Sequence, residues 1–156
     1  MLGYLGVVKM GLLGSNMSHD PAQTPNRHFP HLTPTNHRIT SPADAAYNCA
    51  AWAAGEMNQW WEPGYFWPVA DEFGLRKAFE QLGFVRVSKE AITDIGDTVV
   101  LYSLGIDDTH IARRLSNGLW TSKLGKWQDI EHDSPEAVAG GVYGEIVDYL
   151  GKPNRP

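Results

Sequence analysis

The sequence predicts an α+β domain in which an N-terminal cysteine helix packs on a small antiparallel β-sheet and a further helix closes the chain. Three patterns lead to this expectation. Four alanines surround Trp52 directly after the only cysteine, Cys49, and alanine is the strongest helix former. Asn117-Gly118 lies between two strand-like runs, which is typical of a tight β-hairpin. Near the C-terminus, apolar residues recur at helical spacing.

The helix around Cys49 has two possible starting points. Asn48 is a good N-cap, because its side-chain oxygen accepts from the free N–H groups of the first turn, and Gly55 can end the helix. Cys49 would then lie at the positive end of the helix dipole, where a thiolate is stabilised. Alternatively, the segment 41–44, Ser-Pro-Ala-Asp, begins a helix that runs to residue 54 and places Cys49 in its middle.

An aromatic loop and a second helix are expected after the cysteine helix. Five aromatic residues between 60 and 67 are interrupted by a proline and a glycine, so this stretch is not a regular helix and plugs the core or lines a cleft. Apolar residues at i, i+3, i+4 and i+7 predict a helix over 75–82, which Gly83 ends. The other expected elements are strands over 84–87, 98–102, 110–115 and 119–124, a helical turn opened by Ser134-Pro135, and a helix over 142–150.

The Asn117-Gly118 turn also predicts which side chains share a face of the sheet. A two-residue turn at this dipeptide pairs Ala112 with Lys123. Because side chains alternate along a strand, Lys123 would then share a face with His110, and Ser122 would point to the other face.

The composition is that of an ordinary globular domain. With 156 residues, of which 42% are hydrophobic and 20% charged, the chain can bury a core in one domain. A net charge of −5 without a basic cluster argues against a nucleic-acid partner. A single cysteine forms no internal disulfide, so no oxidising compartment is required.

Residues 1–40 are expected to form an extended arm, and residues 41–152 the domain. The first 14 residues are mildly apolar but contain Lys9 and four glycines, and they are too short to span a bilayer. They are either a poor secretion signal or an extension ahead of a start at Met10 or Met17, so the expected location is cytoplasmic, or exported by a route not visible in the sequence. The region also holds His19, His28, His31 and His37, whose spacing matches no metal-ligand motif.

The order of these features resembles the papain-like fold, and within it the NlpC/P60 and CHAP groups of cysteine peptidases and amidases. In those families a cysteine begins a helix on a small antiparallel sheet, and a histidine begins a strand of that sheet. The matching residues here are Gly96-Asp97 before a strand, His110 at the start of the next one, and Asn117-Gly118 after it. The resemblance covers residues 44–125 and departs at the nucleophile, where Asn-Cys-Ala-Ala replaces Asp-Cys-Ser-Gly. Tyr-Asn-Cys, Thr-His and Thr-Ser-Lys-Leu-Gly segments also resemble those of a small uncharacterised bacterial family.

The resemblance implies a thiol hydrolase that acts on a peptide, amide or acyl substrate without a cofactor. The charge, the histidine spacing and the short apolar N-terminus add the expectation of no nucleic-acid partner, no metal and no membrane partner. Cys49 would attack the carbonyl carbon, and His110 would carry the proton. A third group must fix the tautomer of the histidine, and we expect Asp129 in this role, with His132 as the alternative. The candidates for oxyanion and substrate contacts are Tyr47, Asn48, Trp52, Ser122, Lys123 and His132.

Two functions are consistent with these residues. In a thiol hydrolase, Cys49 and His110 meet in a solvent-reachable cleft, and the pKa of the thiol is lowered. In a catalytically inactive binding module, the aromatic loop 60–67 is the recognition surface, and Cys49 is buried with a raised pKa. The surroundings of Cys49 therefore separate the two hypotheses.

Overall fold

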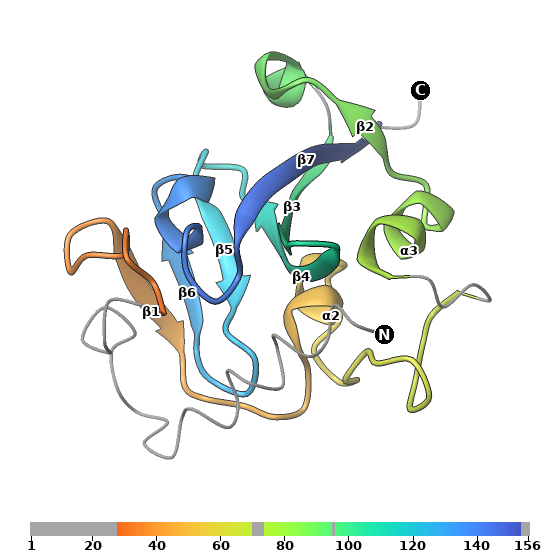
Figure 1. The fold of residues 1–156 in the computed structure, drawn as a ribbon, viewed down its shortest axis with the longest axis horizontal. Coiled ribbons are helices and arrows are strands. Elements are labelled where there is room, and N and C mark those ends of the chain that lie inside the picture. The colour runs from red at the N-terminus through yellow and green to blue at the C-terminus, as the bar shows by residue number, and fades with distance from the viewer. Residues whose placement is uncertain (1–27, 70–73, 95, 154–156) are drawn as a thin grey trace.

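The computed structural model describes residues 28–69, 74–94 and 96–153. Its main element is a seven-stranded antiparallel sheet with the strand order β1-β6-β5-β4-β3-β7-β2 (Figure 1). The strands are β1 (His37–Ser41), β2 (Val85–Val87), β3 (Asp97–Leu104), β4 (Asp107–Arg114), β5 (Trp120–Lys123), β6 (Asp129–His132) and β7 (Glu145–Lys152). The helical elements are α2 (Cys49–Ala53), α3 (Leu75–Gln81) and the 3-10 helices η2 (Lys89–Asp94) and η3 (Pro135–Val138).

This β-rich architecture contradicts the predicted papain-like α+β fold. The cysteine helix has only five residues, and the expected C-terminal helix over 142–150 is largely the strand β7. Ile146, Val147 and Tyr149 favour strands, and Gly144 before them has a φ of +75°, which interrupts a right-handed helix. Since β7 pairs with β3 on one side and β2 on the other, sheet pairing outweighs the helical spacing of its apolar residues.

The helix that carries the cysteine starts at the later of the two expected positions. It begins at Cys49, and the preceding Asn48 caps it by accepting from the Ala51 N–H at 3.3 Å. Residues 42–48 are not helical, and Gly55 follows the helix with a φ of +91°. The prediction of an Asn48-capped helix is therefore confirmed, as are the helix beginning at Leu75 and the strands β2 and β3.

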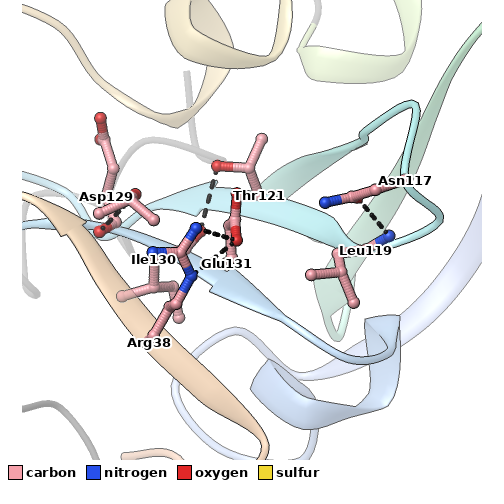
Figure 2. Close-up of polar contacts among 8 residues, drawn as sticks. Arg38, Asn117, Leu119, Thr121, Asp129, Ile130 and Glu131 are labelled. Atoms are coloured by element: carbon pink, nitrogen blue, oxygen red, sulfur yellow. Dashed lines mark hydrogen bonds and ion pairs between the residues drawn. The ribbon is translucent and has the colours of Figure 1, made fainter.

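Part of the segment predicted as an arm belongs to the packed sheet. Phe29 and Leu32 are buried, and β1 pairs with β6 at one edge. Figure 2 shows this edge, where Arg38 forms an ion pair with Glu131 at 2.9 Å. The Thr40 hydroxyl donates to the Asp129 carbonyl oxygen at 3.2 Å. Residue 19 of the histidine-rich region lies outside the described residues.

The sheet has a hydrophobic core on each face. On the helix face, α2 and α3 pack on the strands (Figure 1), and this core includes Cys49, Phe79, Val99, Leu101, Ile111 and Leu150. On the opposite face, which we call the tyrosine face, η3 and the 28–32 segment cover the strands. That core includes Phe29, Val100, Tyr102, Ala112, Trp120, Ile130, Val138, Tyr143 and Tyr149.

The β4–β5 hairpin forms, but its register differs by one residue from the predicted one. Arg113 pairs with Thr121, and the Leu115 N–H donates to the Leu119 carbonyl at 2.7 Å. The turn is therefore a three-residue loop, in which Gly118 has a φ of +88°, as such loops require at their last position. Because a shift of one residue exchanges the faces of a strand, the predicted placement of two side chains is wrong: Ser122 lies on the face of His110, and Lys123 lies on the helix face.

We predict that Gly144→Ala strongly destabilises the fold. A Cβ at this position would lie 2.1 Å from the Ser103 carbonyl oxygen, in addition to the strain of a φ of +75°. Urea unfolding should show a loss of about 3 kcal/mol or more. Gly105→Ala is the control, because Gly105 has a φ of +65° but no atom within 4 Å of the added carbon, and it should cost about 1 kcal/mol. Equal losses in the two variants would contradict the contact.

Candidate active site

The candidate site lies where β4 and β5 diverge. The two strands pair only at Arg113 with Thr121 and Arg114 with Trp120, so the earlier part of β4 has no ladder partner on this side. Two contacts span this β4–β5 opening instead. The Ile111 backbone N–H points to the Cys49 sulfur, and His110 Nε2 lies 2.9 Å from the Ser122 hydroxyl oxygen. The hairpin thus brings the predicted nucleophile and base to one opening.

Cys49 is fully buried at the start of α2. Burial raises the pKa of its thiol to about 12, although the backbone N–H groups of Ile111, Ala50 and Cys49 itself and the Lys123 ammonium act in the opposite direction. The raised pKa is the one expected for the binding module, and the lowered thiol pKa expected for a thiol hydrolase is not found, because desolvation exceeds what these groups and a helix of five residues supply. The resting thiol is therefore protonated.

A chain of hydrogen bonds fixes the orientation of His110 on the tyrosine face. The Ser122 hydroxyl lies between His110 Nε2 at 2.9 Å and His132 Nε2 at 2.8 Å. His132 Nδ1 in turn lies 2.8 Å from the Ser134 carbonyl oxygen. All three side chains are buried, so no solvent replaces these contacts.

The direction of each hydrogen bond in this chain follows from its last acceptor. A carbonyl oxygen only accepts, so His132 Nδ1 donates to Ser134 and its neutral ring must accept at Nε2. The Ser122 hydroxyl therefore donates to His132 and accepts from His110 Nε2. This leaves His110 Nδ1 as an acceptor, and it has no hydrogen-bond partner among the described residues. Burial, and secondarily His132, hold the pKa of His110 well below its ordinary value, so its ring is neutral at pH 7.

Tyr143 connects the cysteine and the histidine, and sequence reasoning missed it. Its ring stacks on His110 with centroids 3.9 Å apart and an interplanar angle of 4°. Its buried hydroxyl has no partner in the described part of the chain. Burial, and then the nearby Cys49, raise the pKa of Tyr143 well above its ordinary value. The incorrect assignment of residues 142–150 to a helix hid this role, because Tyr143 lies in the turn before β7.

Cys49 and His110 reach the opening from different faces of the sheet. The neighbouring Ile111 belongs to the core of the helix face, together with Cys49, whereas His110 contacts Tyr102 and Tyr143. Since His110 Nδ1 is unpartnered, the two side chains share no hydrogen bond in this structure. At the opening they therefore lie on different faces of the sheet and do not form a face-to-face pair.

Asp129, the predicted orienting group, points to the helix face instead. Its Oδ2 accepts from the Tyr47 hydroxyl at 2.6 Å, while its buried Oδ1 has no partner within the described ranges. Burial raises the pKa of this carboxyl group. The position expected for Asp129 beside His110 is taken by Ser122, with His132 behind it.

Lys123 is the cross-strand partner of Asp129 and is buried beside Tyr47. Its ammonium donates to the carbonyl oxygens of Asp44 and Gly125 and lies 4.8 Å from the centre of the Tyr47 ring. Burial lowers the pKa of Lys123 to about 8. This side chain stabilises the loop before α2 and places a cation near Cys49.

The two remaining candidates have structural contacts. Asn48 uses its amide oxygen to cap α2 and its amide nitrogen to donate to the Trp61 carbonyl at 2.8 Å. Trp52 donates through Nε1 to the Thr121 hydroxyl at 2.9 Å. Both residues hold α2 in place against the sheet and the aromatic loop.

The aromatic loop divides between core and surface. Trp61 is buried, whereas Tyr65 is 73% exposed and Phe66 is 41% exposed. A shallow pocket of about 420 Å³ lies beside the loop, lined by Ala45, Trp60, Glu62, Tyr65 and Lys126. Neither Cys49 nor His110 lines it.

No group of three or more His, Cys, Asp or Glu side chains in the described residues is arranged to hold a metal ion. Within the same residues, no helix is both long enough and apolar enough to cross a membrane.

Comparison with known proteins identifies the family of this chain. A family described as "Domain of unknown function (DUF7689)" matches residues 38–151. The chain belongs to this family. No curated protein and no solved structure matches the chain. The DUF7689 match includes α2, β4, β5 and β6, and hence every residue of the His110–Ser122–His132 chain.

The buried histidine chain predicts a loss of stability in acid. Burial lowers the pKa of His132 from 6.5 to about 4, so between these values the unfolded chain binds more protons and stability falls as the pH falls. At about 1.4 kcal/mol for each pKa unit, His132 should account for about 3 kcal/mol across this interval. Urea unfolding from pH 7 to pH 4 should show a shallower decline in His132→Gln.

The matched control is His31→Gln, which removes an exposed imidazole from the same protein. This variant should keep the decline of the wild type. A decline in His132→Gln as steep as in the wild type would show that His132 is not held neutral in the folded state.

Proposed function

We propose that this protein is a thiol hydrolase in which Cys49 is the nucleophile and His110 the general base. The observation that carries the proposal is the state of His110. Its Nε2 is engaged by Ser122 and His132, and its Nδ1 is a buried acceptor without a partner. A buried polar atom left unpaired costs free energy and requires an explanation, and a catalytic role is one such explanation.

The reaction assigns one role to each group at the opening. The Cys49 sulfur forms a bond to the carbonyl carbon of an amide or ester while its proton passes to His110 Nδ1. The protonated imidazole then gives this proton to the leaving amine or alcohol, and a thioester remains. Water, deprotonated by the same nitrogen, hydrolyses the thioester and frees the thiol. The backbone N–H groups of Cys49, Ala50 and Ile111 surround the sulfur and stabilise negative charge.

The resting pair is neutral, and this determines how it would react. Burial keeps the thiol protonated and the imidazole unprotonated, so no thiolate–imidazolium pair is stored. Proton transfer must therefore accompany the attack on the carbonyl, as in general-base catalysis by a hydroxyl nucleophile. Ser122 and His132 support this transfer, because they hold the histidine in the tautomer whose Nδ1 accepts.

A non-catalytic binding module is the second candidate, and one observation favours it. Cys49 has no exposed surface and a raised pKa, which are features of an inert core cysteine. The exposed Tyr65 and the pocket it shares with Trp60 would then provide the recognition surface. The two candidates differ in whether the folded protein can be acylated at Cys49.

We predict that p-nitrophenyl acetate acetylates Cys49 in the native protein at a rate that changes little between pH 6 and 8. A neutral base with a pKa well below 6.5 is fully available across this range. An ordinary thiol instead accelerates about tenfold per pH unit below its pKa of about 8.5. Mass spectrometry of quenched samples gives the rate and the site of acetylation.

His110→Ala should slow acetylation by about a hundredfold or more at pH 7 and restore the steep pH dependence. Ser122→Ala should slow acetylation by a smaller factor, because it removes the hydrogen bond that fixes the His110 tautomer but keeps the base. His31→Ala, at an exposed histidine, should react as the wild type does. If Cys49 is acetylated only after urea unfolds the protein, it is a packing residue and the binding module becomes the leading candidate.

A further inference from the structure

A second pocket lies at the other end of α2 from Cys49. It has a volume of about 370 Å³ and is bounded by residues of α2, the aromatic loop, the segment between α3 and β2, and the strands β3, β4 and β7. Its lining combines apolar surface with charge. The apolar residues are Ala53, Ala54, Trp61, Leu82 and Phe84, and the charged residues are Asp97, Arg113 and Lys152.

Arg113 is the unusual member of this lining. It lies on the helix face of β4, opposite Val99, and its guanidinium is 5.5 Å from the centre of the Trp52 ring. Its Nε is buried and has no hydrogen-bond partner among the residues described. A guanidinium is always charged and presents N–H groups in a planar fork, so a buried Nε without an acceptor is costly. The cation–π contact with Trp52 does not satisfy that N–H.

Two cations and one carboxylate line the pocket, which leaves it with a net positive charge. Asp97 and Lys152 are cross-strand partners in the β3–β7 ladder. The Lys152 side chain extends along Gly83, where an added Cβ would lie 3.3 Å from its Cε. Of the two cations in the lining, Arg113 is the one with a buried N–H that lacks an acceptor among the described residues.

We propose that this pocket binds a carboxylate that carries an apolar group. The carboxylate would accept from the Arg113 fork, which matches its geometry in a bidentate manner. The apolar group would pack against Trp61, Leu82 and Phe84. The pocket is at the small end of the range for ligand sites, so the occupant is a single aromatic or branched aliphatic unit, either a free acid or the C-terminal residue of a peptide.

Calorimetric titration of the whole protein with two acids and their amides tests this proposal. The probes are 3-phenylpropionate and 3-phenylpropionamide, and N-acetyl-Ala-Phe with a free or an amidated C-terminus. Both acids, or the peptide acid alone, should bind at least about tenfold more tightly than the corresponding amides. Binding of both acids indicates a free-acid site, and binding of the peptide acid alone indicates recognition of a C-terminus.

Arg113→Gln should weaken acid binding by at least about tenfold. Arg114→Gln is the matched control, because it removes the same charge from the next residue, which lies on the tyrosine face opposite Trp120. Equal affinity for acids and amides, absence of binding, or equal effects of the two substitutions would overturn the proposal. The acid–amide comparison is made on the wild type, so it decides the question even if Arg113→Gln fails to fold.

Discussion

The register of the β4–β5 hairpin is the constraint on which the candidate site depends. The three-residue loop that ends at Gly118 pairs Arg113 with Thr121, and every side chain of β5 and β6 takes its face from that pairing. A two-residue loop would place Lys123 beside His110, and a lysine cannot accept the proton of an imidazole. With the observed register, Ser122 takes that place. The additional loop residue thus places Ser122, instead of Lys123, beside His110 and allows the His110–Ser122–His132 hydrogen-bonded chain to form.

The same register separates two kinds of polar group across the sheet. The tyrosine face holds His110, Ser122 and His132, which are neutral and joined by hydrogen bonds. The helix face holds Asp129 and Lys123 around Tyr47. Burying a charge is expensive unless it is paired or hydrogen-bonded, and the ammonium is held by two backbone carbonyls. The two faces meet at the opening between β4 and β5, and the Cys49 sulfur lies there.

The sequence predicts local features of this protein better than distant ones. The sequence correctly predicts the Asn48 cap, the helix at Leu75 and the presence of a hairpin around Gly118, because each depends on residues within one turn or loop. The fold class and β7 were not, because apolar residues at helical spacing also suit a strand buried between two others. At the site, the sequence indicated Cys49 and His110 but favoured Asp129 over Ser122 and His132, and that error follows directly from the loop length.

The electrostatics of the opening explain why a reactive pair would be kept neutral here. A stored thiolate–imidazolium pair needs solvent or strong counter-charges, and Cys49 and His110 are both fully buried. Three N–H groups and one ammonium lower the cost of a thiolate, yet burial still raises the thiol pKa to about 12. At His110, burial disfavours the charged imidazolium and so lowers the pKa of the ring. Both shifts favour the uncharged forms, so the fold avoids two buried charges at rest. In the proposed reaction, charge would form only when a carbonyl carbon arrives to accept the sulfur, and the unpartnered His110 Nδ1 would take the proton.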